Sequence, residues 1–118
     1  MAASETLDRL WNCATGDAAR AGFPYQRRLA LEPWPDLLKI PTGLGKTAGV
    51  ALAWMHKRLE EDFRTPRRLV WCLPMRTLVE QTAKNVDVWL EKVRKSGLDP
   101  NGRADYLQMF VWALARVN

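Results

Sequence analysis

The sequence predicts an α/β fold in which a parallel sheet is flanked by helices. Three observations predict it. A short apolar run at residues 36–40 is followed by a glycine-rich loop and then by a helical pattern over residues 46–62. A second apolar run at residues 68–73 is followed by a longer amphipathic helix over residues 76–95. Two strand–helix units in succession are typical of a parallel sheet, because each helix returns the chain to the start of the next strand.

Two helices are predicted ahead of the sheet. Ser4 suits a helix N-cap, and residues 4–16 carry apolar side chains at helical spacing. These side chains are Leu7, Leu10, Trp11 and Ala14. A short helix is predicted over residues 25–31, and it ends before Pro33 and Pro35 because proline cannot continue a helix.

The helix predicted over residues 76–95 has the clearest pattern in the chain. Its apolar side chains repeat at three- and four-residue intervals, and Gly97 supplies a stop. The residues expected to face inward are Leu78, Val79, Thr82, Val86, Trp89, Leu90 and Val93. In the helix before it they are Val50, Ala51, Trp54, Met55 and Leu59. The apolar residues 103–118 fit either a helix or a strand.

Composition and charge limit the class of protein. One domain is expected from 118 residues, and 18 Lys+Arg against 13 Asp+Glu give a net charge of +5. No apolar stretch approaches the ~20 residues that span a bilayer, and Glu5 and Asp8 stand where a signal peptide needs apolar residues. Cys13 and Cys72 are isolated and the chain has one histidine, so we expect reduced thiols and no zinc site. A cytoplasmic protein without membrane contact is predicted.

A phosphate-binding segment is predicted at Pro-Thr-Gly-Leu-Gly-Lys-Thr, residues 41–47, between the first strand and its helix. Gly43 and Gly45 allow a tight turn whose backbone N–H groups face phosphate oxygens. Lys46 is the expected catalytic residue because its ammonium reaches the β- and γ-phosphates, and the Thr47 hydroxyl is the expected Mg²⁺ ligand. The ATP-binding set in this segment is Thr42, Gly43, Leu44, Gly45, Lys46 and Thr47.

One residue departs from the general phosphate-loop pattern, which is Gly-x-x-x-x-Gly-Lys-Ser/Thr. Ile40 stands where that pattern has its first glycine. The alternative interpretation is a strand-to-helix turn with incidental glycines. The intact Gly-x-Gly-Lys-Thr between a predicted strand and a predicted helix favours nucleotide binding.

Two flanking segments extend the predicted site. Phe-Pro-Tyr-Gln-Arg at residues 23–27 places Gln26 about twenty residues before Lys46. A glutamine amide can pair with the adenine edge through its donor and acceptor together. Leu-Pro-Met-Arg-Thr-Leu-Val-Glu-Gln-Thr at residues 73–82 opens a helix, where an arginine and backbone amides suit the phosphates of a nucleic acid strand. The residues expected on that strand are Pro74, Arg76, Thr77 and Gln81. The alternatives are a helix start with a stray glutamine and a capped amphipathic helix.

In their residues and in their order along the chain, these segments resemble the Q motif, motif I and motif Ia of superfamily 2 helicases. They are most similar to the signature helicase–nuclease of type I CRISPR systems, over about residues 22–93. The resemblance implies an incomplete first helicase lobe at residues 22–102, with a P-loop (RecA-like) parallel sheet, after an N-terminal helix at residues 1–21. It also implies binding of ATP with Mg²⁺, translocation on single-stranded DNA in antiviral defence, and recruitment by a crRNA-guided surveillance complex.

Several motifs and domains that are typical of that family are absent from the sequence. The Asp-Glu-x-His-type motif, the second lobe with its arginine fingers and a His–Asp nuclease cluster are missing, and His56 is the one histidine. ATP turnover by this chain alone is therefore not expected. We expect residues 103–118 to be an apolar tail at which the sequence is truncated or frame-shifted. Two alternatives are a non-catalytic nucleotide- or nucleic-acid-binding module and a small kinase, the latter disfavoured by Gln26 and the Pro-x-Arg run.

Aromatic and basic residues outside these segments are mostly assigned to packing or solvent. Trp54, Trp71 and Trp89 fall on apolar faces or in a strand and are expected in the core. Trp34, between two prolines, is the most exposed candidate for base stacking and has no assigned role. The basic connector formed by Arg64, Arg67 and Arg68 is either solvated or in contact with nucleic acid.

Overall fold

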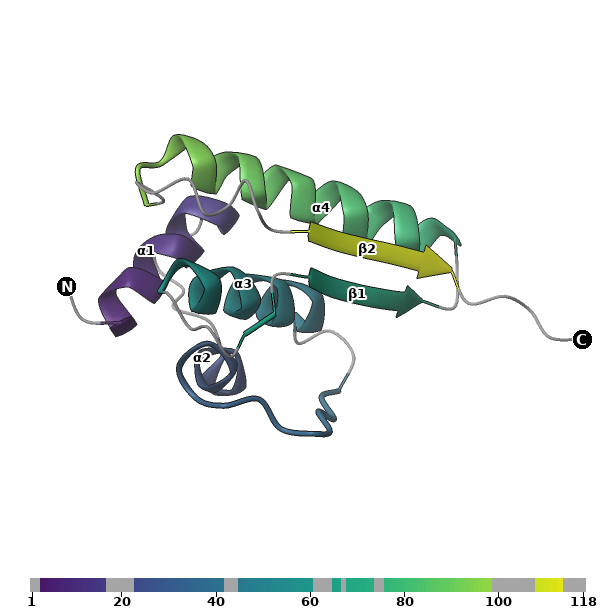
Figure 1. The fold of residues 1–118 in the computed structure, drawn as a ribbon, viewed down its shortest axis with the longest axis horizontal. Coiled ribbons are helices and arrows are strands. Elements are labelled where there is room, and N and C mark those ends of the chain that lie inside the picture. Colours follow the sequence, from purple (N-terminus) through teal and green to yellow (C-terminus); the bar gives the residue numbers. More distant parts are fainter. Residues whose placement is uncertain are drawn as a thin grey trace, which may run out of the picture.

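The computed structural model describes residues 3–16, 23–41, 45–60, 65–66, 68–73, 76–98 and 108–113. These residues form four helices and two strands (Figure 1). In chain order the elements are α1 Ala3–Thr15, α2 Pro24–Leu31, α3 Lys46–Leu59, β1 Arg68–Leu73, α4 Arg76–Lys95 and β2 Gln108–Ala113. The two strands pair in parallel, from Arg68 opposite Gln108 to Leu73 opposite Ala113.

The predicted fold class is wrong. The described chain is mostly helical with one two-stranded sheet, and it is not a P-loop (RecA-like) parallel sheet flanked by helices. The strand expected at residues 36–40, ahead of the phosphate loop, does not form. Pro33, Pro35 and Pro41 surround this run and lack the N–H that a strand ladder needs, and Leu37 is 70% exposed. A short apolar run between prolines was therefore not enough to make a buried strand.

The other predicted elements are confirmed with small changes at their ends. Helices α1 and α2 begin and end within one residue of the prediction, and β1 and α4 have the predicted bounds. Helix α3 ends at Leu59, three residues earlier than expected. Strand β2 falls inside the apolar residues 103–118, for which the sequence allowed a helix or a strand.

One hydrophobic core joins the four helices. It consists of Leu7, Leu10, Trp11, Ala14, Leu29, Ala30, Ala51, Leu52, Ala53, Trp54, Met55, Val86, Leu90 and Val93. Burial of each large side chain contributes about 1.5–3 kcal/mol. All four face residues predicted for α1 are in this core, so α1 packs with the elements that follow it. Leu78, which was expected to face inward on α4, is instead 38% exposed.

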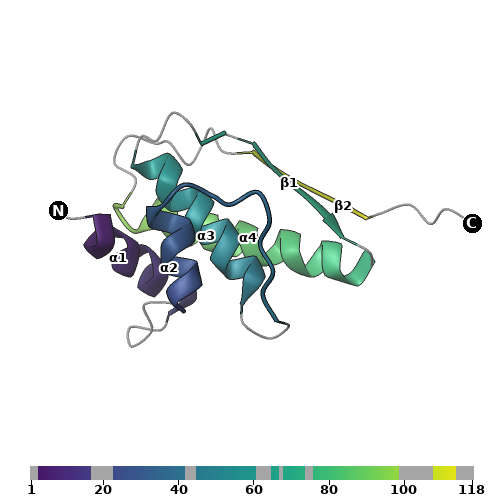
Figure 2. The same cartoon turned by 90° about the horizontal axis from the view of Figure 1, so that it is seen from below.

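Helices α3 and α4 run in the direction opposite to the two strands (Figure 1). Helices α3 and α4 both begin toward the end of the molecule where β1 and β2 finish (Figure 1). Figure 2 shows the sheet edge-on beside the N-terminal half of α4, with α1 and α2 at the other end of that helix. The helix starts that carry the predicted site residues therefore lie toward the carboxyl ends of the strands, where parallel sheets commonly bind ligands.

Candidate nucleotide-binding site

The Gln26 side chain joins the start of α2 to the start of α3. It is 3% exposed, and its Oε1 accepts a hydrogen bond from the Phe23 backbone N–H at 2.7 Å, which caps α2. Its Nε2 donates to the Gly45 carbonyl oxygen at 2.9 Å, across 19 residues of sequence. Both the oxygen and the nitrogen of this amide form hydrogen bonds within the chain. The Gln26 side chain therefore holds two predicted motif segments together.

Two glycines make room for this side chain. Gly45 has φ +69° and ψ +42°, a left-handed conformation, and a Cβ there would lie 2.8 Å from Gln26 Nε2. Gly49, one turn later and buried in α3, would place a Cβ 2.9 Å from Gln26 Cγ. Gly49 was not among the predicted site residues, although an isolated glycine inside a helical pattern indicates a close approach.

Lys46 and Thr47 open the first turn of α3. The Lys46 side chain is exposed and Thr47 is half-buried. The first turn carries no acidic residue, and its backbone N–H groups have no intrahelical partners. Together with the helix dipole, these groups favour an anion at this end of α3. Thr42, Gly43 and Leu44, the other predicted phosphate-loop residues, lie outside the described residues.

A cavity of about 270 Å³ lies beside α2. Tyr25 lines it from the helix, and Leu38 and Ile40 line it from the segment that leads into the phosphate loop. The Phe23 ring stacks on Tyr25, with centroids 6.4 Å apart, and is 43% exposed. Burial raises the pKa of the Tyr25 phenol above its ordinary value, against a smaller lowering by a Gln26 hydrogen bond. Arg28 and Glu32 also line the cavity, and its other described lining residues, apart from Tyr25, are apolar. An aromatic ring beside apolar walls suits a nucleobase.

Of the four residues that were predicted to contact nucleic acid, the structure describes two in full, Thr77 and Gln81. Thr77 and Gln81 are exposed and lie one turn apart on α4, so they share a face. Pro74 and the side chain of Arg76 lie outside the described residues. The start of α4 lies toward the same end of the molecule as the start of α3 (Figure 1).

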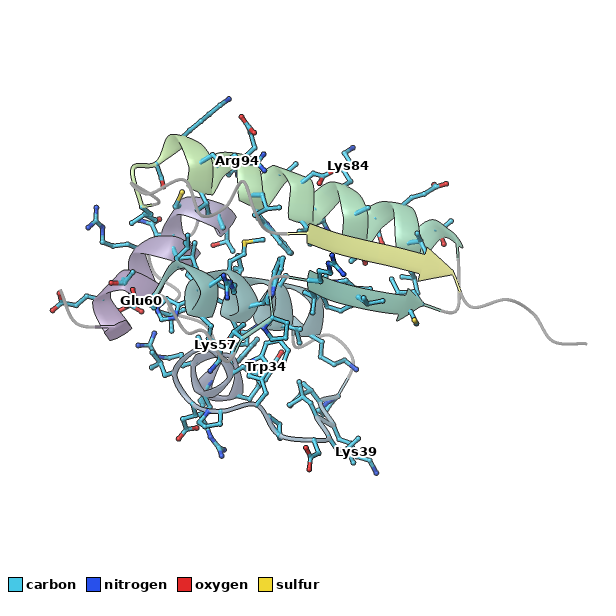
Figure 3. All side chains as sticks on the ribbon, in the orientation of Figure 1. Trp34, Lys39, Lys57, Glu60, Lys84 and Arg94 are labelled. Atoms are coloured by element: carbon cyan, nitrogen blue, oxygen red, sulfur yellow. The ribbon has the colours of Figure 1, made fainter. Side chains whose placement is uncertain are left out.

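In the part of the chain that the structure describes, no group of three or more His, Cys, Asp or Glu side chains could hold a metal ion. None of the described helices is both long and apolar enough to cross a membrane. His56 is 3% exposed within α3, and its Nε2 lies 4.0 Å from Glu60 Oε1 one turn later, so the histidine packs inside the protein (Figure 3 labels Glu60).

Comparisons with protein families, with curated proteins and with solved structures find no match to this chain.

Proposed function

We propose that this chain binds ATP with Mg²⁺ at the start of α3, as the ATP-binding portion of an ATP-dependent single-stranded-DNA translocase of CRISPR antiviral defence. The observation that carries the proposal is the hydrogen bond from Gln26 Nε2 to the Gly45 carbonyl. It ties the aromatic segment beside the 270 Å³ cavity to the helix start that carries the phosphate-binding residues. ATP needs both places together, because its base and its phosphates belong to one molecule.

The two parts of the site have different chemistry. The base occupies the cavity beside Tyr25, while the phosphates face the first turn of α3 and the Lys46 ammonium. Thr47 offers one hydroxyl ligand, which fits Mg²⁺ because this ion usually keeps water and substrate phosphates as its other ligands. When bound, Mg²⁺ would neutralise part of the phosphate charge. Gln26 acts by positioning Gly45 rather than by reading the base.

The DNA strand is assigned to the start of α4. Thr77 and Gln81 offer polar groups on one exposed face, and the helix start favours a phosphate. The motif resemblance supports this assignment, and also recruitment by a crRNA-guided surveillance complex and action in the cytoplasm. Turnover of ATP requires the acidic motif and the second lobe, which this sequence lacks.

Replacing Lys46 tests the proposal. Lys46→Ala is expected to weaken binding of ATP with Mg²⁺ about ten- to a hundredfold, because a hydrogen bond to a charged group contributes about 1.5–3 kcal/mol. Isothermal titration calorimetry measures the change. Lys84→Ala, on the exposed surface of α4 (Figure 3), removes the same charge elsewhere and is expected to bind ATP like the wild type. Wild-type affinity in Lys46→Ala, or no ATP binding by the wild type, contradicts the proposal.

The corrected fold favours a second candidate function, a non-catalytic nucleotide- or nucleic-acid-binding module. The segment at residues 36–41, which leads into the predicted phosphate loop, is irregular, so in the described residues no strand directly precedes that loop. Coupling between ATP and single-stranded DNA separates the two functions, since a motor portion binds both ligands on one chain. A change in ATP affinity when single-stranded DNA is added supports the motor portion, and an ATP affinity that DNA leaves unchanged supports the module.

A further inference from the structure

A second cavity, of about 340 Å³, adjoins the cavity assigned to the ATP base, and Pro33 is the residue that lines both. It is formed by Trp34 in the segment after α2, by Trp54 and Lys57 in the C-terminal half of α3, and by Arg68 at the start of β1. Trp54 is eight residues beyond Lys46 along α3, which at 1.5 Å per residue is about 12 Å. The cavity therefore does not include the predicted phosphate-binding residues.

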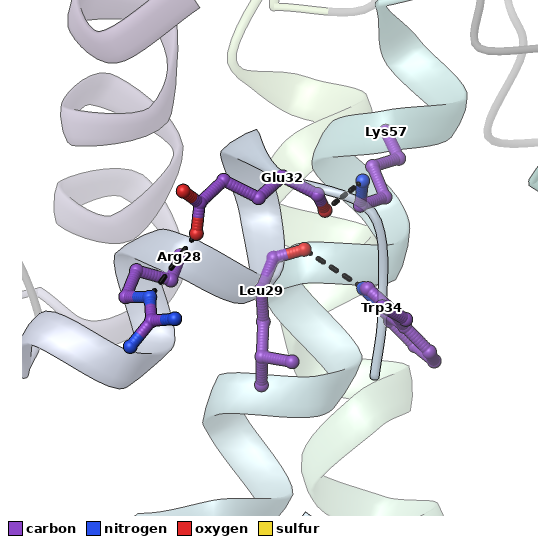
Figure 4. A network of polar contacts seen from close by, with 5 residues as sticks. All are labelled: Arg28, Leu29, Glu32, Trp34 and Lys57. Carbon is purple, nitrogen blue, oxygen red and sulfur yellow. Dashed lines mark hydrogen bonds and ion pairs between the residues drawn. The ribbon is translucent and has the colours of Figure 1, made fainter. Parts of the chain in front are cut away.

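Hydrogen bonds fix both tryptophans of this cavity. Trp34 Nε1 donates to the Leu29 carbonyl at 2.8 Å, and Trp54 Nε1 donates to the Pro66 carbonyl at 2.8 Å. Trp54 is 1% exposed and forms the inner wall, whereas Trp34 is 40% exposed and forms the outer one. Figure 4 shows the Trp34 bond beside Lys57. Because its N–H is already bonded, Trp34 can offer a ligand its ring surface.

The charge around the cavity is positive. Lys57 is 9% exposed, and its Nζ donates to the Glu32 backbone carbonyl at 2.6 Å (Figure 4). The Glu32 carboxylate points to Arg28, with Arg28 Nε 3.1 Å from Glu32 Oε2. Among the lining residues that the structure describes, the charged ones are Lys57 and Arg68, and both are cations. Aromatic walls beside two cations favour a planar ring that carries an anionic group.

We propose that this cavity binds a nucleotide unit, with its base stacked on Trp34 and its phosphate facing Lys57 and Arg68. The volume matches a small-molecule site, and the partial exposure of Trp34 leaves the site open to solvent. The unit is either a free nucleotide or one nucleotide of a single strand, since both present the same base and phosphate. The proposal goes beyond the ATP site and stands without it.

The test uses the full chain and two probes, a fluorescein-labelled ten-residue oligothymidylate and thymidine monophosphate. Fluorescence anisotropy measures the affinity for the oligonucleotide, and the monophosphate is added as a competitor. Trp34→Ala is expected to weaken oligonucleotide binding about five- to a hundredfold, as loss of one stacking platform does. Arg68→Gln is expected to weaken it less, and Lys95→Gln, a matched loss of charge at the C-terminal end of α4, to leave it unchanged.

Controls separate stacking from folding and from the ATP site. Trp34→Phe loses the bond to Leu29 but keeps an aromatic face, so it is expected to stay closer to wild type than Trp34→Ala. Lys46→Ala is expected to lose ATP and keep oligonucleotide binding. Competition by the monophosphate identifies a free-nucleotide site, and its failure identifies a strand site. If neither probe binds, or if folded Trp34→Ala and Arg68→Gln both bind like wild type, the proposal is overturned. If Trp34→Ala does not fold, Arg68→Gln decides.

Discussion

Gly45 is the residue at which the geometry of the candidate site is most tightly constrained. Its φ is +69°, and an added Cβ would lie 2.8 Å from Gln26 Nε2. Gly45→Ala is therefore expected to lower the free energy of unfolding by about 2–4 kcal/mol, through left-handed strain and through displacement of the amide. Urea denaturation measures the loss.

Gly16 provides the matched control. Its φ is +76°, close to that of Gly45, but no atom lies within 4 Å of its added Cβ. Gly16→Ala is expected to cost only the backbone strain, about 1–2 kcal/mol. Equal losses in the two variants contradict the claim that the Gln26 side chain constrains Gly45.

The sequence assigned Gln26 and Gly45 to one predicted site but did not predict the contact between them. The motif pattern placed Gln26 and Gly45 in one site, and the hydrogen bond between them agrees with that placement. The hydrogen bond uses the Gln26 amide, which was expected to pair with adenine. The sequence could not predict this, because local patterns do not show which distant acceptor a buried side chain contacts. The single signal for this contact was Gly49, a glycine inside an otherwise helical run.

Among the elements, regular helices were predicted well and the first strand was not. Helix α4 has the predicted bounds because twenty residues of apolar periodicity precede a glycine that takes a positive φ, Gly97. Residues 36–40 form an apolar run of only five residues without periodicity. So short a run does not distinguish a strand from an irregular segment. Prolines on both sides decided the outcome.

Two leucines of α4 test how this element packs. Leu90 is 8% exposed in the core and Leu78 is 38% exposed. Leu90→Ala is expected to lower the free energy of unfolding by about 2–5 kcal/mol, because it removes buried methyl groups and leaves a cavity, whereas Leu78→Ala is expected to cost about 1 kcal/mol or less. Urea denaturation of both variants is the measurement. A larger loss for Leu78 would mean that α4 presents a different face to the core.

For the whole molecule, the order of the four helices and of β1 was predicted, but the partner of β1 in the sheet was not. A strand, a helix and a parallel strand follow one another as β1, α4 and β2. A two-stranded sheet is marginal by itself, so it depends on α4 and on the helical core that α1 and α3 complete. Sheet size is a tertiary property, since each strand must find a neighbour, and no local pattern reports it.

Net charge is also a property of the whole chain. The salt dependence of oligonucleotide affinity shows how many of its cations contact phosphates. The excess of +5 attracts any polyanion, but only cations in contact with phosphates release counterions. Two such contacts, from Lys57 and Arg68, predict a slope of about −1.4 for the logarithm of affinity for oligothymidylate against the logarithm of salt concentration. Between 50 and 200 mM salt the affinity is then expected to fall about sevenfold.

Two variants separate charge from stacking. Arg68→Gln should halve the slope. Trp34→Ala should lower the affinity at every salt concentration and keep the slope, because stacking releases no counterions. Anisotropy titrations across salt measure both quantities, and a flatter slope in Trp34→Ala would show that the tryptophan acts through the charges and not through the base.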